Sequence, residues 1–322
     1  MILSPAAKLI EGKRLLIVSD GALQFVPFSA LPTPEDQRVP LLVKHEIVDL
    51  PSASVLAEIR RASAGRPRPL REVAVLADPV FDSADERVVN RAHGENIVLR
   101  RKGASGQSIS SAVLTRSATD IGLTKNGTVY LTRLLSSRLE AKAIMAVTPP
   151  GKRLTAVDFS ASRKMAVNPI LGQYRVVHFA THGFLDSKHP ELSGLVLSLV
   201  NKQGRPMDGF LNLQDIYNLN LPVDLVVLSA CETALGEEIR GEGMVGLTRG
   251  FMYAGASRVI ASLWNVSDEA TSELMALFYR AMEVQHMRPS AALRQAQIQM
   301  WKQSRWAPAY YWAAFQIQGE WK

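Results

Sequence analysis

Cysteine is nearly absent from this sequence, because Cys231 is the only one in 322 residues. Long apolar runs are absent too, and none approaches the roughly 18 residues of a membrane-spanning helix. The N-terminus also lacks the cationic head and apolar stretch of a secretory signal. The first absence excludes an internal disulfide and the second a transmembrane segment, so we expect a soluble protein of the reducing cytoplasm.

Aromatic residues are scarce, at 7% of the chain, and they do not alternate with the basic ones. The 37 Lys and Arg outnumber the 30 Asp and Glu, and the resulting net charge of +7 is compatible with nucleic-acid binding. However, the basic residues are scattered or form short groups such as "RRKG" at 100–103, unlike a single-strand binder. We therefore expect a solvated basic surface and no nucleic-acid partner.

The sequence does contain a regular alternation of short β-rich runs with helical patterns. This order is typical of βαβ units and of a mainly parallel sheet covered by helices. The 47% hydrophobic content allows one large domain or two smaller ones with a substantial core. The expected strands lie within residues 14–18, 44–50, 72–77, 174–180, 224–230, 257–264 and 312–318.

Two helices are expected in the last sixty residues. Ser267 is a suitable N-cap for the first, with acidic residues in its first turn, and Pro289 stands near the first turn of the second. Apolar residues recur along one face of each helix: Leu274, Phe278 and Met282 in the first, and Leu293, Ala296 and Met300 in the second. Residues 63–69 indicate a linker, and the polar residues 83–128, which have no sustained period, indicate an exposed insertion.

Two strand patterns end in reactive side chains. Leu225–Leu228 are apolar, as in a strand buried on both faces, and Cys231 follows them among small and polar residues. The run "RVVHFATHGF" ends at His182 and Gly183. In open α/β sheets chemistry gathers beyond the carboxyl ends of the strands, where His182 could hold Cys231 as a thiolate. Their separation, 231 − 182 = 49 residues, is close to the roughly 50 between histidine and cysteine in caspases.

Each of these residues also has a structural interpretation. A cysteine after an apolar strand is commonly buried and inert. His178, four residues before His182, is better explained as a packed, hydrogen-bonded histidine. The spacing of the two histidines resembles a metal site, but residues four apart on a strand are too distant for one ion, so we expect no metal.

The segment "GEGMVG" at 241–246 matches the dinucleotide pattern GxGxxG. It does not directly follow a strand, and no acidic residue ends a strand about 20 positions later, as a dinucleotide site requires. We expect its glycines to let a helix pack closely, and a nucleotide-binding enzyme stays an alternative.

Several long motifs occur in a specific order: "LLIVSDGALQFVPFSALP", "LPSASVL", "VLADPVF", "VVHFATHG", "SGLVLS", "DLVVLSACETA", "GEGMVGLTRGFMYAGASRVIASLWNVSDEAT" and "YYWAAFQIQGEW". Together they resemble the CHAT domain, a caspase-like peptidase module often attached to tetratricopeptide repeats. The resemblance implies a caspase-haemoglobinase-like α/β fold, related to caspases, metacaspases and separase, in which helices flank a mainly parallel sheet. It divides the chain into an N-terminal β-containing segment, 1–68, and a caspase-like catalytic region, 69–322, with the insertion at about 83–128.

The resemblance also implies a catalytic site. Cys231 would be the nucleophile and His182 the general acid and base of a cysteine peptidase that needs no cofactor. The backbone amides of Gly183 and Cys231 would form the oxyanion hole. No third residue that orients His182 is evident in the sequence.

The substrate pocket is expected around Asp268. Ser229 occupies the substrate-binding position where metacaspases have an acid, so a basic-residue pocket of the metacaspase kind is not expected. The run "LWNVSDEAT" resembles a separase segment that lines the pocket for a basic P1 residue, which makes Asp268 the pocket acid and Asn265 and Trp264 its neighbouring walls. An Asp in the first turn of a helix also has a purely structural explanation.

The resemblance thus implies a cysteine endopeptidase that cleaves a dedicated protein substrate after a basic residue, under the control of a regulatory repeat or sensor protein. In bacteria, similar modules are linked to defence and programmed cell death. No membrane partner is expected. The main alternative is a non-catalytic or latent interaction module; the presence of His182, Gly183 and Cys231 argues against loss of activity but not against latency.

Overall fold

A computed structural model describes residues 3–89, 109–120, 124–125, 128–129, 131–186, 189–229 and 242–321 of the chain. Three parts of the sequence predictions lie outside these residues. They are Cys231, Gly241 of the glycine-rich segment, and the stretches 90–108, 121–123 and 126–127 of the expected insertion.

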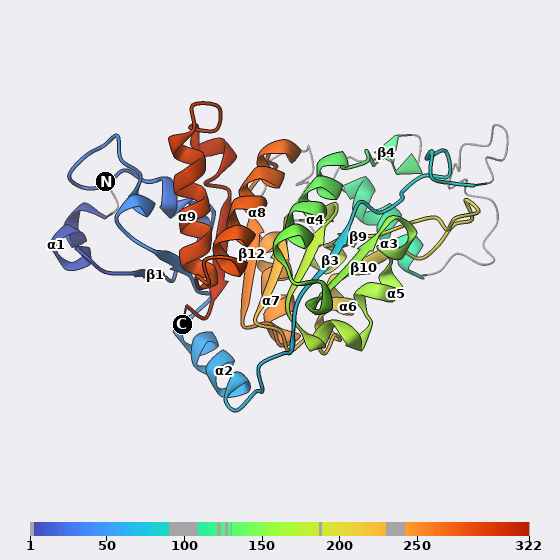
Figure 1. Cartoon of the computed structure of the whole chain (residues 1–322), viewed down its shortest axis with the longest axis horizontal. Helices are drawn as coiled ribbons and strands as arrows, with labels where there is room; N and C mark the ends of the chain where they lie inside the picture. Colours follow the sequence, from blue (N-terminus) through green and yellow to red (C-terminus); the bar gives the residue numbers. More distant parts are fainter. Residues whose placement is uncertain are drawn as a thin grey trace.

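An eight-stranded sheet forms the centre of the molecule, in the order β1-β2-β13-β12-β11-β7-β3-β6 (Figure 1). Every pairing between neighbouring strands is parallel except that of β12 with β13. The expected mainly parallel sheet is therefore confirmed. Its strands are β1 (Leu15–Ile17), β2 (Ile47–Asp49), β3 (Arg71–Ala77), β6 (Arg153–Val157), β7 (Tyr174–Ala180), β11 (Leu225–Leu228), β12 (Arg258–Ser262) and β13 (Phe315–Gly319).

The central strands have apolar side chains on both of their faces. In β3, Val73 and Val75 belong to one hydrophobic core, while Ala74 and Leu76 belong to the other. A strand covered on both faces needs a continuous apolar run, which is the pattern by which these strands were predicted. The sequence prediction missed β6, an edge strand in which only Ala156 is buried.

Helices cover both faces of the sheet (Figure 1). The core on one face contains residues of α4 (Leu135–Val147), α8 (Asp268–Glu283) and α9 (Pro289–Lys302). The core on the other face contains residues of α2 (Ala53–Ser63), α5 (Arg163–Ala166), α6 (Leu213–Tyr217) and α7 (Glu242–Tyr253). The two predicted C-terminal helices are confirmed as α8 and α9, with Ser267 as the N-cap of α8 and the six predicted apolar positions buried.

A second, antiparallel sheet stands beyond the carboxyl end of β7, in the order β10-β9-β8. Its strands are β8 (Gly183–Phe184), β9 (Gly194–Val196) and β10 (Phe210–Asn212). Helix α3 (Ile109–Asp120) packs against it, and Leu114 and Ala118 are buried there. We expected residues 83–128 to be exposed, and α3 corrects this because these two residues, four apart, form a small apolar face. The same segment contains β4 (Thr124–Lys125) and β5 (Thr128–Val129).

The N-terminal segment extends the main sheet. Strand β2 pairs with β13, and Leu42 and Val48 are buried in the same core as α9. Arg294 of α9 donates hydrogen bonds to the carbonyl oxygens of Leu42 and Val43. Residues 1–68 therefore share a core with the rest of the chain. The short helix α1 (Ala7–Ile10) buries none of its residues.

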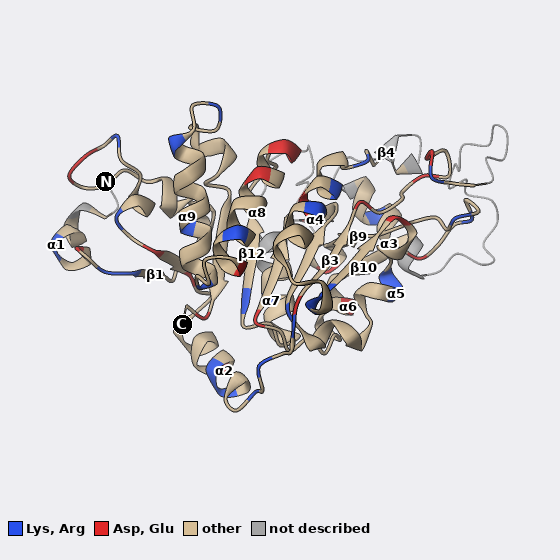
Figure 2. Ribbon diagram, in the orientation of Figure 1, with Lys and Arg blue, Asp and Glu red and all other residues tan. Residues whose placement is uncertain are grey.

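The charged residues are spread over many elements. Figure 2 shows Lys and Arg on helices of both sheet faces and on several loops, without concentration on a single element. In the part of the chain that the structure describes, no helix has both the length and the apolar composition that crossing a membrane requires.

Candidate active site

The predicted cysteine and histidine strands are neighbours in the sheet. Strand β11 pairs in parallel with β7, with Val227 opposite His178 and Leu228 opposite Phe179. The carboxyl ends of the two strands therefore open at the same edge of the sheet, as predicted. Cys231 stands three positions after the end of β11 in the sequence, outside the described residues.

His182 is held in a defined orientation just beyond β7. Its side chain is buried, and its Nε2 lies 2.7 Å from the carbonyl oxygen of Thr132. Because a carbonyl only accepts hydrogen bonds, Nε2 carries a proton, and in the neutral imidazole Nδ1 is then the basic nitrogen. The ring of Phe81 also packs on the imidazole, with 5.0 Å between the ring centres. The sequence did not reveal Thr132, since a backbone carbonyl has no signature in the residue type.

Gly183 begins β8, at the edge of the small sheet. The amide of Val196 donates to the carbonyl of His182, so these two residues form a hydrogen-bonded pair. In an antiparallel ladder the next pair, Gly183 with Leu195, is not hydrogen-bonded. The amide of Gly183 is therefore directed away from β9, as an oxyanion-hole donor requires.

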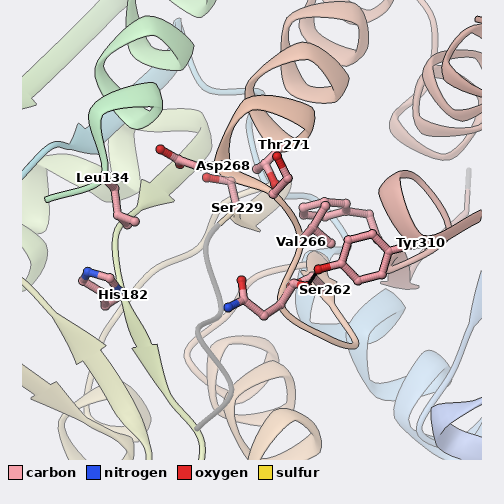
Figure 3. A pocket seen from close by; sticks show the side chains of 11 residues that line it. Leu134, His182, Ser229, Ser262, Val266, Asp268, Thr271 and Tyr310 are labelled. Atoms are coloured by element: carbon pink, nitrogen blue, oxygen red, sulfur yellow. Dashed lines mark hydrogen bonds between the residues drawn. The ribbon is translucent and has the colours of Figure 1, made fainter. Parts of the chain in front are cut away.

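A cavity of about 310 Å³ lies beside His182 (Figure 3). Ser229, Asn265 and Asp268 also line it, so four of the predicted site residues meet there. The predicted wall residue Trp264 is not among the lining residues that the structure describes, and its indole N–H donates to the carbonyl of Tyr310. The other lining residues are Leu134, Ser262, Val266, Ser267, Thr271, Tyr310 and Phe315.

Asp268 has both a structural partner and access to the cavity. Its Oδ2 accepts a hydrogen bond of 2.9 Å from the amide of Ser136, in the first turn of α4. No lysine or arginine among the described residues forms an ion pair with it. Asp268 is also the only carboxylate among the described lining residues, so it gives the cavity a negative charge.

The side chain of Ser229 contacts a buried histidine, His178. Its Oγ lies 3.1 Å from Nε2 of His178, and the same nitrogen lies 2.7 Å from Oε1 of Glu140 on α4. Nδ1 of His178 lies 3.0 Å from the hydroxyl of Tyr279. Burial and the charge of Glu140 raise the pKa of Tyr279 well above its usual value, so its hydroxyl keeps the proton with which it can donate to Nδ1 of His178. The predicted packed, hydrogen-bonded histidine is confirmed.

All residues of the glycine-rich segment after Gly241 lie in helix α7. A Cβ added at Gly246 would lie 3.4 Å from Cδ2 of Leu213 on α6, so the two helices are in contact at this residue. This agrees with the predicted packing role of the glycines, of which Gly241 lies outside the described residues. Among the described residues, no three His, Cys, Asp or Glu side chains lie close enough together to hold a metal ion.

The chain resembles known proteins in sequence. The CHAT domain matches residues 1–320. Tetratricopeptide repeat protein 28 of Homo sapiens is 24% identical over 319 residues, which are 95% of this chain and 12% of that protein. The chain therefore spans only a small part of this relative's length. The protein of the same name from Mus musculus is 28% identical over 195 residues, 50% of this chain and 8% of its own length.

The chain also resembles solved structures. The Saccharomyces cerevisiae separase–securin complex at 3.0 Å resolution has a TM-score of 0.50 and 12% identity, over 95% of this chain and 15% of that chain. The Arg specific cysteine proteinase gingipain R has a TM-score of 0.47 and 10% identity, over 86% of this chain and 54% of that chain.

The likeness to separase extends over almost all of this chain, and it supports a caspase-like α/β fold, as the parallel sheet with helices on both faces does. The family match extends over the same elements, from the N-terminal segment to β13. The chain therefore belongs to the CHAT domain family, with the fold of caspase-like cysteine proteases.

Proposed function

We propose that this protein is a cysteine endopeptidase in which Cys231 is the nucleophile and His182 the general acid and base. The observation that supports the proposal most is the state of His182. Its Nε2 is bonded to the Thr132 carbonyl, which leaves Nδ1 as the base beside a cavity at the carboxyl ends of β7 and β11. A nucleophile on the segment after β11 would meet that base.

The reaction follows from these groups. Nδ1 of His182 takes the proton of the Cys231 thiol. The resulting thiolate attacks the substrate carbonyl carbon, a C–S bond forms, and the oxygen becomes an oxyanion that accepts from the amides of Gly183 and Cys231. His182 gives its Nδ1 proton to the amide nitrogen, the C–N bond breaks and the amine leaves. Water then attacks the thioester and gives one proton to Nδ1, the C–S bond breaks to restore the thiolate, and the carboxylic acid product leaves and ionises in solution.

The proposed specificity is for a basic residue on the amino side of the cleaved bond. Asp268 is the one carboxylate that lines the cavity among the described residues, and Thr271, Val266 and Tyr310 supply polar and apolar walls. A lysine or arginine side chain would place its charge near Asp268 and its stem along the apolar walls. Asn265 stands in the same lining, with its backbone oxygen accepting from the hydroxyl of Tyr310.

The alternative is a latent or non-catalytic interaction module. Two relatives are named for tetratricopeptide repeats, and this chain spans 12% of the human protein. A repeat segment or repeat protein is therefore our proposed regulatory partner, in addition to a dedicated protein substrate. A latent enzyme retains a reactive Cys231 thiolate, whereas a pure scaffold has no need of one.

A peptide-library digest tests the proposal. The full 322-residue chain and its Cys231→Ala variant are incubated with the same mixture of peptides, and the cleaved bonds are read by mass spectrometry. We expect cleavage after Arg or Lys by the parent chain and none by the variant. Cleavage after other residues would retain the dyad and remove Asp268 from the pocket.

A thiol-reactive probe gives the deciding result if neither protein cleaves a peptide. Labelling of Cys231 that requires His182, tested with His182→Ala, would indicate a latent enzyme. Labelling that is equally slow in parent and variant would support the scaffold and contradict the proposed function.

A further inference from the structure

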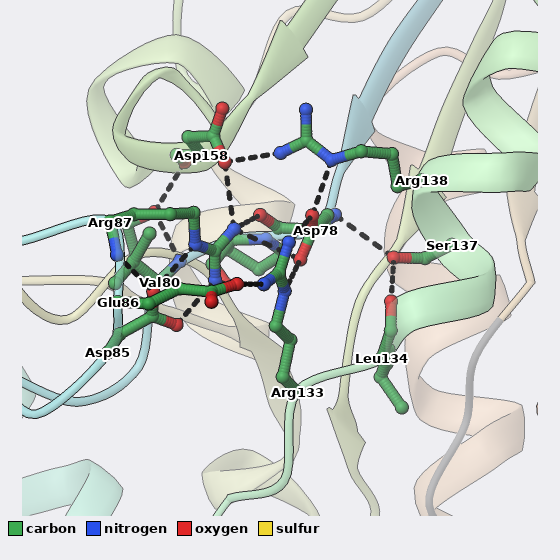
Figure 4. Close-up of polar contacts among 12 residues, drawn as sticks. Asp78, Val80, Asp85, Glu86, Arg87, Arg133, Leu134, Ser137, Arg138 and Asp158 are labelled. Atoms are coloured by element: carbon green, nitrogen blue, oxygen red, sulfur yellow. Dashed lines mark hydrogen bonds and ion pairs between the residues drawn. The ribbon is translucent and has the colours of Figure 1, made fainter.

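A cluster of ion pairs surrounds Asp78, the residue that follows β3 (Figure 4). Its carboxylate is fully buried and contacts three guanidinium groups, those of Arg87, Arg133 and Arg138. The arginines are in turn paired with further carboxylates: Asp85, Glu86 and Asp158. Burial alone would raise the pKa of Asp78, but the hydrogen bonds from Arg133 and Arg138 and the charge of Arg87 outweigh it and lower the pKa. Asp78 is therefore ionised at neutral pH.

The backbone at this cluster is unusual. Asp78 has a φ of +47° and Asp158, just after the neighbouring strand β6, has a φ of +54°. A left-handed conformation is uncommon for residues other than glycine and has a cost in free energy, so the surrounding contacts must maintain it. Both residues accept from the same arginines, Arg87 and Arg138.

Arg133 has the most specific geometry of the three. Its Nε and Nη2 each donate 2.9 Å hydrogen bonds to the two oxygens of Asp78, and its Nη1 donates to Glu86 at 2.8 Å. A bidentate pair of this kind fixes both the position and the plane of the guanidinium. Leu134, the residue after Arg133, is also linked to Asp78 through a side chain of α4. Ser137 Oγ accepts from the amide of Asp78 and donates to the carbonyl of Leu134.

The residues on either side of Arg133 belong to the candidate active site. The carbonyl of Thr132 accepts from Nε2 of His182, and Leu134 lines the cavity. The segment that orients the histidine is therefore joined to the end of β3 by a bidentate ion pair.

We propose that Asp78 and Arg133 are positioning residues for His182: their ion pair fixes residues 132–134 and thereby holds the Thr132 carbonyl at Nε2 of the histidine. The effect of this ion pair on the rate of peptide cleavage rests on the proposed function, whereas its effect on the orientation of His182 does not.

Arg138 supplies a matched control. It also donates to Oδ2 of Asp78, at 2.6 Å, but it belongs to α4, where the helix itself maintains the backbone. Arg133→Gln and Arg138→Gln each remove one cation from the same carboxylate. Only Arg133→Gln removes the ion pair that holds the residue next to Thr132 at Asp78.

The orientation is measured on the full chain with Cys231→Ala and ¹⁵N-labelled histidine, so that no peptidase activity is needed. In the parent and in Arg138→Gln we expect a downfield, slowly exchanging Nε2–H signal from His182, identified by its loss in His182→Gln. In Arg133→Gln and Asp78→Asn that proton should exchange rapidly with water. An unchanged signal in folded Arg133→Gln, or equal loss in Arg138→Gln, would overturn the proposal.

The kinetic measurement uses the active chain and the best peptide from the library. Arg133→Gln should lower kcat about 10- to 100-fold with KM changed by less than about 3-fold, because a misplaced catalytic group costs rate rather than binding. Arg138→Gln should retain kcat within about 3-fold, and a loss equal to that of Arg133→Gln would contradict the proposal. If the parent cleaves nothing, labelling of Cys231 by the thiol-reactive probe decides the proposed function, and the histidine signal still decides the positioning role.

Discussion

The carboxylate of Asp268 accepts from the amide of Ser136 and also faces the cavity, so its two roles must be separated by substitution. Asparagine keeps an oxygen that can accept from Ser136 but has no charge. Asp268→Asn should therefore lower kcat/KM for Arg and Lys peptides at least about 30-fold, because breaking a buried charge pair costs about 2 kcal/mol or more. Its free energy of unfolding should change by less than about 0.5 kcal/mol, measured by urea denaturation.

Asp268→Ala is the matched variant, because it removes the hydrogen bond as well. It should lose the preference for Arg and Lys peptides to the same extent as Asp268→Asn. Its free energy of unfolding should also fall by about 1 kcal/mol. If Asp268→Asn lowered cleavage after neutral residues as much as cleavage after arginine, the carboxylate would act on the fold and not in the pocket.

Asp49, the last residue of β2, is partly buried beside β13, and this burial raises its pKa from 3.8 to about 7. The folded state thus favours the protonated form. The associated stability is fully present below about pH 4, where the unfolded chain is protonated too, and it is lost as the pH rises toward 7. Asp49→Asn should be nearly neutral at pH 4 and stabilising at pH 8, by at most about 4 to 5 kcal/mol at about 1.4 kcal/mol per pKa unit.

Urea denaturation of the parent and Asp49→Asn at pH 4 and pH 8 measures this difference. A stability difference between the two proteins that is the same at both pH values would mean that Asp49 titrates normally in the folded chain.

The close contact between helices α6 and α7 limits the size of the side chain that α7 can have at each position facing α6. A Cβ at Gly250 would lie 2.9 Å from Cδ1 of Leu213 and 3.2 Å from Cγ2 of Ile216, while a Cβ at Gly246 would make an ordinary contact. Alanine favours a helix by up to about 1 kcal/mol over glycine, whereas overpacking costs about 1–3 kcal/mol. Gly246→Ala should therefore stabilise the chain by about 0.5 kcal/mol, and Gly250→Ala should destabilise it by about 1 kcal/mol.

Thermal or urea unfolding of both variants tests this packing. Equal stabilisation by the two alanines would show that α6 moves aside without cost and that the glycines serve another purpose.

The length and burial of each element explain why some strands and helices were predicted from the sequence and others were not. The central strands were predicted because burial on both faces requires apolar runs, and α8 and α9 because of their caps and apolar faces. Strands β8 and β10 have only two and three residues, too few for a period to appear, and β6 stands at the sheet edge with polar residues among its five. Helix α3 was missed because its buried face contains few residues.

The molecule as a whole folds around a core that the N-terminal segment helps to complete. Deletion of residues 1–68 removes the buried side chains of Leu41, Leu42 and Val48, each worth about 1.5–3 kcal/mol, from proteins that are typically stable by only 5–15 kcal/mol. The remaining chain should therefore lose its cooperative unfolding transition and bind a hydrophobic dye. Near-ultraviolet circular dichroism and dye fluorescence measure this.

Deletion of residues 1–12 is the control for that experiment. The helix α1 it removes buries no residues, so the shortened chain should unfold like the parent. A cooperative transition in the chain of residues 69–322 would instead identify the N-terminal segment as a separate domain.

Residue type and order were enough to predict the mainly parallel sheet and the family, and to single out the two strands that precede His182 and Cys231; that these strands are neighbours came from the structure. Apolar runs and motifs are local patterns that can be recognised in the sequence. In a parallel sheet the site is expected beyond the carboxyl ends of the strands, which lie at one edge. The contacts that orient the site needed the folded chain. Thr132 is 50 positions from His182, Asp78 is 55 from Arg133, and Ser136 is 132 from Asp268. Two of these contacts also use backbone groups, which are the same in almost every residue and become specific only when folding places them.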